Sequence, residues 1–182
     1  AAFAFVGLQA LFDSFFVTFL VNGLGHSLVT AGTVFSAAQA VAVVTRVLWG
    51  AIAGSLASPR IVLAGLGVAM AAASAAMGLA GPGWPILAVG AVAVVYTATA
   101  FSWHGVLLAE VARLAPAGRV GATTGGVIVF IMASSTLYPL VFAALLAATG
   151  SFGAGYGLAA LPALIVGVRL ALGGRDEGAD GR

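Results

Sequence analysis

Long apolar stretches alternate along the chain with short turns rich in glycine, proline and polar residues. A bilayer core about 30 Å thick needs about 20 apolar helical residues to cross it. The stretch 61–80 shows none of the polar–apolar alternation that is typical of barrel strands. The pattern predicts an all-α membrane protein with six transmembrane helices and a polar tail over 173–182, the spans covering about residues 3–22, 30–56, 61–80, 86–114, 120–149 and 152–172.

The composition indicates that lipid, and not water, surrounds most of this protein. Of its 182 residues, 62% are hydrophobic and 7% are charged, whereas soluble domains average roughly 45–50% apolar and about 25% charged residues. These values exclude a soluble enzyme, a disordered tail and a disulfide-rich secreted domain. The net charge of +2 includes no basic run, so no nucleic-acid partner is expected. The lack of cysteine excludes disulfides and cysteine-ligated metals.

The arginines predict the orientation of the helices. The connections after the first, third and fifth spans carry no arginine. Every arginine except Arg46 lies at or near the connections after the second and fourth spans or at the end of the sixth. Because arginine-rich short loops stay on the cytoplasmic side, both termini are predicted to be cytoplasmic. Arginine is the only basic residue type besides histidine, a bias that suggests a GC-rich bacterium and hence its inner membrane. The arginines outside the spans are Arg60, Arg113, Arg119, Arg169, Arg175 and Arg182.

Polar residues are spread unevenly over the six spans. The first and second spans carry several, the third almost none, and the fourth, fifth and sixth repeat that order. Polar groups are costly in lipid and therefore face protein or a water-filled cavity. The pattern predicts two three-helix repeats, in which the first, second, fourth and fifth spans surround a path. The third and sixth spans would then be outer supports that face lipid.

Two segments resemble the major facilitator superfamily of transporters. The first, Arg46 to Gly50 and on to Pro59-Arg60, resembles the signature Arg-x-x-x-Gly-x-x-x-Asp-Arg between the second and third helices of a half. The second, 103–113 followed by 118–121, resembles the connection between the fourth and fifth helices. Gly54 and Ser55 replace the usual acid and arginine, which favours the C-terminal half, where this motif is often eroded.

This resemblance implies a fold of two inverted three-helix repeats, forming one six-helix half of a transporter. It implies secondary active transport of a small solute by alternating access, with proton coupling as a further possibility. The chain starts at Ala1 in apolar sequence, without methionine or a charged leader, and is expected to be part of a longer protein. The expected partners are the solute, the lipid bilayer and an N-terminal six-helix half that precedes Ala1.

Charged and amide side chains within the first two spans are the main candidates for a solute or ion pathway. Asp13 lies near the middle of its span with Gln9 one turn away, and is either a proton carrier or solute contact, or a structural partner of another helix. Gln39 and Arg46 share one face of the second span. Arg46 could bind an anion or pair with Asp13, but we favour a gate residue that binds helix ends on the cytoplasmic side.

The fourth span supplies a second group of candidates. Tyr96, Thr99 and Trp103 fall along one stripe that could stack on or hydrogen-bond a small organic ligand. His104 is either a hydrogen-bonded core residue or a proton relay. Two histidines on different helices without a ligand cluster indicate no metal, and no cofactor is expected. Glu110 and Arg113 are expected to form an ion pair at a helix end.

Glycine and proline suggest contacts and bends between helices. Two motifs with small residues four apart, Gly50/Gly54 and Gly121/Gly125, are expected to be sliding contacts with the other half. Pro139, directly after Tyr138, is expected to kink the fifth span.

Two other functions were weighed against transport. An intramembrane enzyme would need a nucleophile and a base, and only Ser134, Ser135 and His104 offer one; no enzymatic activity is expected. An aquaporin-like channel would carry Asn-Pro-Ala half-helix motifs, which the sequence lacks.

Overall fold

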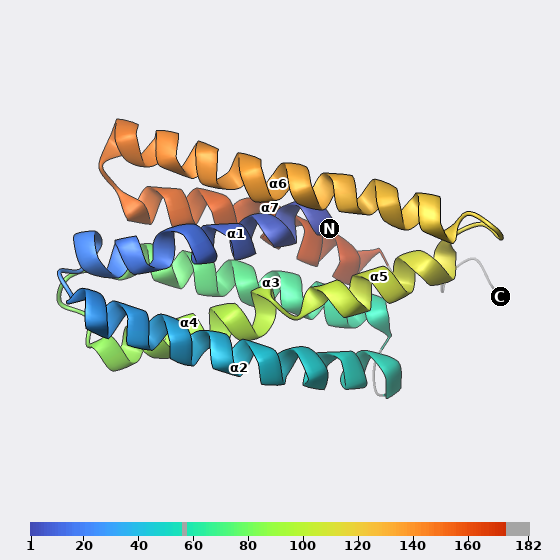
Figure 1. Ribbon diagram of the computed structural model, residues 1–182, viewed down its shortest axis with the longest axis horizontal. Coiled ribbons are helices and arrows are strands. Elements are labelled where there is room, and N and C mark those ends of the chain that lie inside the picture. The colour runs from blue at the N-terminus through green and yellow to red at the C-terminus, as the bar shows by residue number, and fades with distance from the viewer. Residues whose placement is uncertain (56–57, 174–182) are drawn as a thin grey trace.

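The computed structural model describes residues 1–55 and 58–173, with only the backbone given for Gly54 and Ser55. All elements in these ranges are helical (Figure 1). They are α1 (Ala2–Thr18), its π-helical continuation η1 (Phe19–Gly23), α2 (Leu28–Ser55), α3 (Pro59–Leu79), α4 (Ile86–Ala100), α5 (Trp103–Leu114), α6 (Val120–Thr149) and α7 (Phe152–Leu172). Together these form six spans that are long and apolar enough to cross a membrane, as predicted. The tail from residue 174 onward lies outside the described residues.

The fourth span is interrupted, which the sequence did not predict. Helix α4 ends at Ala100 and α5 begins at Trp103, so Phe101 and Ser102 form a turn inside one span. Three hydroxyl groups near the turn bond to carbonyls of the preceding helical turn, among them Ser102 Oγ to the Ala98 oxygen at 2.8 Å. Such bonds compete with the regular backbone ladder and bend helices, which accounts for the interruption.

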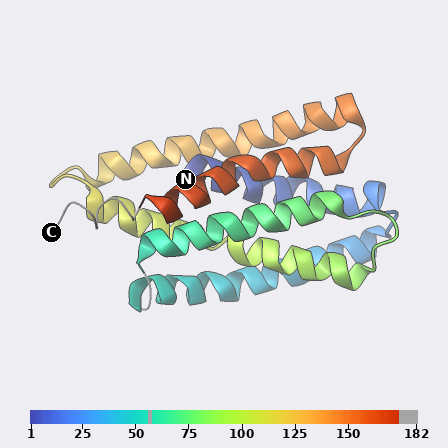
Figure 2. The same ribbon diagram turned by 180° about the vertical axis from the view of Figure 1, so that it is seen from behind.

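Helices α3 and α7 pack along most of their length and lie side by side in the view from behind (Figure 2). Glycines allow this approach, because a Cβ atom on Gly67 would lie 3.0 Å from the Gly167 Cα atom, and one on Gly153 would lie 2.5 Å from the Gly78 oxygen. Polar bonds join the same helices: Ser74 Oγ donates to the Tyr156 oxygen at 2.9 Å. Small residues and interhelical hydrogen bonds are how membrane helices associate in the absence of a hydrophobic driving force.

The distribution of burial differs from the predicted arrangement. The most apolar window of α3 is 56% buried, the same as that of the first span, whereas those of α2 and α6 are only 17% buried. The prediction that the third span is an outer support is therefore wrong for most of its surface. One narrow stripe of α3 does remain exposed, at every third or fourth residue, and it is entirely apolar: Ile61, Gly65, Val68, Ala72, Ala75 and Leu79. The number of polar residues in a span did not predict how deeply it is buried. Helices α2 and α6 carry several polar residues but are little buried, because they have no neighbouring helix on their outer sides.

The connections fall at two ends of the bundle. The turns after η1, α3 and α6 lie at one end, and those after α2 and α5 lie with the end of α7 at the other (Figure 1). Gly150 makes one of the tight turns with φ of 65°, a conformation that glycine adopts without strain. The arginines near connections thus gather at one end. Arg60 there donates from Nε to the Leu170 oxygen at 2.8 Å, which satisfies a carbonyl near the C-terminus of α7.

Candidate functional site

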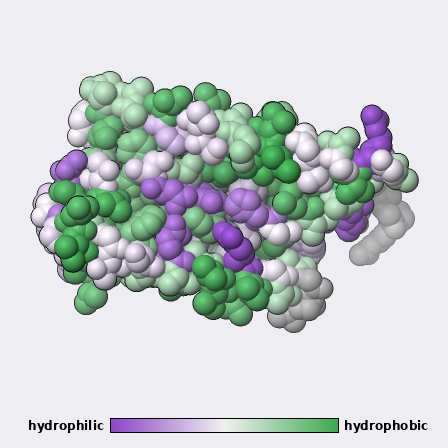
Figure 3. Space-filling view, viewed as in Figure 1, coloured by the Kyte–Doolittle hydropathy of each residue, from purple (hydrophilic) through white to green (hydrophobic). Residues whose placement is uncertain are grey.

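Polar side chains at membrane depth lie on one outer face of the bundle. Hydrophilic residues gather in the middle of the face seen in Figure 1, amid apolar atoms (Figure 3). We use the name polar face for five residues of α1 and α2, of which Gln39 is half-buried and the others are exposed: Asp13, Ser14, Ser36, Gln39 and Arg46. The rest of the outer surface of these helices is largely apolar, with exposed residues such as Val43, Val47 and Leu48.

Asp13 and Gln39 are the centre of the polar face. Gln39 Nε2 donates a hydrogen bond of 2.9 Å to Asp13 Oδ1 and so joins α1 to α2. Asp13 lies eleven positions after the start of α1 at Ala2, which corresponds to about 17 Å along a helix and hence to the middle of a span. Gln9 lies one turn earlier on α1, and its Oε1 is buried without a hydrogen-bond partner among the described residues. The structure therefore brings the two predicted amides close to the predicted acid, but bonds only Gln39 to it.

Arg46 lies at the turn inside the fourth span. Its Nε donates a 3.0 Å hydrogen bond to the Phe101 oxygen, at the C-terminal end of α4. A cation is favourable there, because the last carbonyls of a helix are unpaired and carry partial negative charge. The pairing with Asp13 is not formed, since Asp13 bonds to Gln39 instead. Arg46 thus contacts a helix end, but this end lies inside the fourth span and not at a connection between spans. Its role as a gate residue stays a prediction.

The predicted stripe of the fourth span is buried in the bundle. Tyr96, Thr99 and Trp103 are 0%, 5% and 0% exposed. The Tyr96 hydroxyl donates to the Leu8 oxygen at 2.8 Å, and the Thr99 hydroxyl donates to a carbonyl of its own helix. These bonds satisfy both hydroxyl groups inside the protein. The structure thus places the three side chains in the core and brings none of them to the polar face.

His104 is half-buried next to this core. Its ring stacks on that of Trp103 with centroids 3.8 Å apart, and its Nδ1 has no hydrogen-bond partner within the described ranges. Ser134 donates to the Phe3 oxygen and Ser135 to the Met132 oxygen. Both serine hydroxyl groups thus donate to backbone carbonyls, and no hydrogen bond joins either of them to His104 among the described residues. In the part of the chain that the structure describes, no group of three or more potential metal ligands occurs.

Three of the four glycines in the predicted motifs have open space beside them among the described residues. A Cβ atom added at Gly50, Gly121 or Gly125 would meet nothing within 4 Å, and Gly54 lies where only the backbone is described. Their contact with another bundle stays a prediction. Sequence analysis missed the glycines that do pack closely, at the α3–α7 interface. Gly153 is one of them and is spaced four residues from Gly157 in α7, which was a signal of the same kind, although a Cβ atom on Gly157 itself would meet nothing within 4 Å.

One predicted ion pair is confirmed at the arginine-bearing end. Arg113 Nη2 lies 2.6 Å from Glu110 Oε1, and Arg113 Nε lies 2.8 Å from the other carboxylate oxygen. Exposed pairs of this kind contribute little to stability.

The described residues thus define an all-helical, multi-pass membrane protein by the length and apolar character of its helices. No protein-family model matches the chain. A search of curated proteins also finds no match.

Proposed function

We propose that the chain is the C-terminal six-helix half of a secondary transporter of the major facilitator type, which moves a small solute by alternating access. The polar face is the observation that carries this proposal. Asp13 lies exposed at mid-span beside the half-buried Gln39, and a charged residue at that depth costs about 2.5–3.5 kcal/mol or more if it meets hydrocarbon. A second bundle, with a water-filled crevice between the two, removes that cost.

Two further features support a partner bundle on this side. Helices α2 and α6 are the least buried spans, and both carry the unpacked glycines described above. The interruption between α4 and α5 is also a feature of transporters, in which discontinuous helices lie at binding sites near the midplane. Arg46 extends from the polar face to this interruption and so connects the two.

The remaining parts of the proposal follow from the sequence. The six spans would form two inverted three-helix repeats, in a bacterial inner membrane, with both termini cytoplasmic. The partner bundle is the N-terminal half of the same protein. Within this frame, Asp13 is the group proposed to carry a coupling proton, with Gln9 and Gln39 beside it.

Cysteine accessibility tests whether the polar face borders water. The sequence has no cysteine, so single replacements such as Ser14→Cys and Ser36→Cys give unambiguous sites in this part of the protein. In the full-length protein, made cysteine-free elsewhere and reconstituted in vesicles, a small charged thiosulfonate reagent is expected to modify both. Ala72→Cys on the exposed apolar stripe of α3 is the matched control and is expected to stay unmodified. Equal protection of all three cysteines would contradict the proposal.

A further inference from the structure

Arg46 places a permanent positive charge near the middle of the membrane. It is an exposed residue of the polar face, and its Nε donates to the Phe101 oxygen at 3.0 Å. Phe101 lies between α4, of 15 residues, and α5, of 12 residues, and therefore near the middle of the fourth span. A guanidinium group keeps its charge at any physiological pH, so this charge needs water or an anion at that depth.

No acidic side chain of the described residues pairs with Arg46. The two acids in these ranges are Asp13, which bonds to Gln39, and Glu110, which is paired within α5. Gln39 and Arg46 lie seven positions apart in α2, about 10 Å along the helix, which exceeds the screening length of about 8 Å in physiological salt. His104, on which the Arg46 charge acts electrostatically, carries no negative charge in either protonation state. The charge of Arg46 is therefore left without a counter-ion.

The bond to Phe101 leaves the end of the guanidinium group available. It uses Nε, and the terminal nitrogens Nη1 and Nη2 of this exposed side chain make no hydrogen bond to a described residue. These two nitrogens present parallel N–H groups, which match the two oxygens of a carboxylate. A neutral solute would accept only weaker hydrogen bonds from them, and a cation would be repelled.

The charges of the polar face favour a single negative charge on the solute. Arg46 supplies one positive charge, and the Asp13–Gln39 pair two helical turns away adds a negative one, which repels a second negative charge on the solute. Val43 lies between Gln39 and Arg46 on the same face of α2 and is 68% exposed. It therefore offers an apolar contact for a short hydrocarbon group beside the carboxylate.

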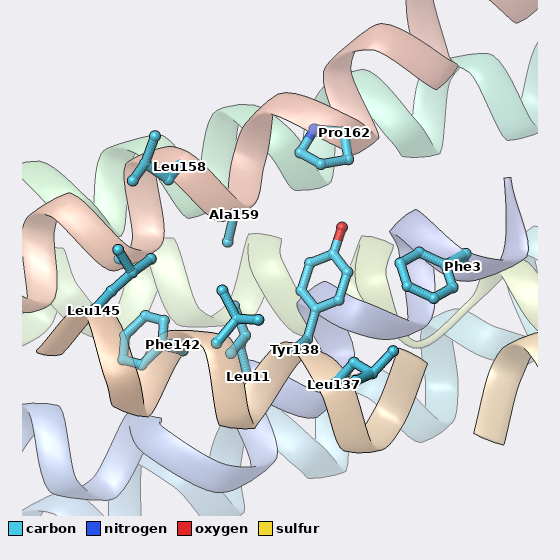
Figure 4. A pocket seen from close by; sticks show the side chains of 11 residues that line it. Phe3, Leu11, Leu137, Tyr138, Phe142, Leu145, Leu158, Ala159 and Pro162 are labelled. Atoms are coloured by element: carbon cyan, nitrogen blue, oxygen red, sulfur yellow. The ribbon is translucent and has the colours of Figure 1, made fainter. Parts of the chain in front are cut away.

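A concave feature elsewhere in the molecule offers no such charge. It is a partly open crevice of about 370 Å³ between α1, α6 and α7. Figure 4 shows its lining, in which the side chains are apolar apart from the Tyr138 hydroxyl. An anion would find no partner among these side chains, so Leu137 in this lining provides a control position.

We propose that the solute is a small organic monocarboxylate, whose carboxylate binds Arg46 and whose apolar part lies on Val43. This inference rests on the proposed transport function, because the polar face must border water for such a solute to reach it. The bond to the Phe101 oxygen then holds the guanidinium group at the depth where the solute binds.

Protection of a cysteine beside Arg46 tests the proposal. Val43→Cys is introduced into the full-length protein, made cysteine-free elsewhere and reconstituted in vesicles, and its rate of modification by N-ethylmaleimide is measured. Butyrate and benzoate are the probes, and the neutral butyramide and benzamide are their matched controls. Each carboxylate is expected to halve the rate at a concentration at least about tenfold below that of its amide, as charge-assisted hydrogen bonds predict. The rate at Leu137→Cys is expected to stay the same with every probe.

Two variants and two further anions complete the test. Arg46→Gln keeps a polar side chain but removes the charge, and is expected to abolish the protection of Val43→Cys by carboxylates. Arg113→Gln is the matched control and is expected to leave that protection unchanged, because Arg113 is paired with Glu110 and lies outside the polar face. Succinate and inorganic phosphate, which carry more than one negative charge, are expected to protect less well than butyrate.

Each contrary result has its own meaning. If Val43→Cys reacts but no carboxylate protects it better than its amide, the proposal is overturned while the transport function stands, since a reactive thiol still indicates that the face borders water. Equal protection by phosphate and butyrate would show a general anion site and also overturn it. No reaction at Val43→Cys, Ser14→Cys and Ser36→Cys alike would contradict the transport function itself, whereas no reaction at Val43→Cys alone would overturn only the solute site. If Arg46→Gln fails to fold, the comparison of each carboxylate with its amide decides.

Discussion

Asp13 is the acidic residue in the interior of the described spans, and the structure gives it a neutral amide as its partner. An arginine partner would hold the carboxylate charged, whereas an amide donor leaves it able to gain and lose a proton. Arg46, the cation of the polar face, is bonded to a backbone carbonyl instead. The two opposite charges on the polar face are therefore bonded to different partners and not to each other.

We predict that Asp13→Asn removes a protonation step without unfolding the protein. Asparagine keeps an Oδ1 acceptor for Gln39, so the bond between α1 and α2 survives and the unfolding temperature in detergent changes little. The infrared difference spectrum on acidification is expected to lose one carboxyl band relative to the wild type. Ser14→Ala, at the neighbouring exposed position, is the control and is expected to leave the spectrum unchanged. Identical spectra for Asp13→Asn and the wild type would assign Asp13 a structural role only.

For single residues, the sequence predicted the surroundings of charged side chains better than those of aromatic side chains. Asp13 and Arg46 are conspicuous because a charge in an apolar span needs a partner. Tyr96 and Trp103 are amphipathic, and the pattern along the chain cannot tell whether such a ring lies against a ligand or in the core. The backbone carbonyl of Leu8, which accepts from Tyr96, lies 88 positions away in the chain and has no sequence signal at all.

Among the elements, α3 and α7 form the most closely packed pair. Their contact is made by glycines and by backbone carbonyls that accept from Ser74 and Arg60. In a bilayer, close van der Waals contact and such bonds supply the association energy that apolar burial supplies in water. This pair is therefore expected to be sensitive to the smallest added side chain.

We predict that Gly167→Ala destabilises the bundle, whereas Gly65→Ala does not. A Cβ atom on Gly167 would lie 2.8 Å from the Val68 nitrogen, which is backbone and cannot move aside, but one on Gly65 would meet nothing within 4 Å. Overpacking costs about 1–3 kcal/mol, against a gain of about 1 kcal/mol in helix propensity that both variants share. Thermal unfolding in detergent, followed by circular dichroism, measures the difference. Equal unfolding temperatures would contradict this view of the interface.

The interruption of the fourth span shows which helix boundaries sequence patterns fail to predict. Span positions were predicted to within a residue or two because hydropathy and turn residues determine them. No proline or glycine marks Phe101 and Ser102, so the usual signals of a helix end were missing. The interruption depends on hydroxyl groups that bond to the backbone and on Arg46 from another helix, which only the tertiary structure brings together.

For the whole molecule, the arginine-bearing connections at one end predict how it is oriented. Ala117 lies in the connection after α5, at that end, and Ser151 lies in the connection after α6, at the other. We predict that an impermeant maleimide added to intact cells modifies Ser151→Cys and not Ala117→Cys, because arginine-rich loops stay on the cytoplasmic side. Permeabilised cells are expected to allow modification of both, which serves as the control. The reverse pattern in intact cells would invert the assigned orientation.

Helices α2 and α6 are longer than the hydrocarbon core of a bilayer is thick. With 28 and 30 residues, they measure about 42 and 45 Å, well beyond a hydrocarbon thickness of about 30 Å. Hydrophobic mismatch of this size is too large for the usual tilt of about 20° to absorb, so the first turns of α6, next to Arg119, must extend into the headgroup layer. Membrane thickness then controls how far this end protrudes, and longer acyl chains will draw it inward.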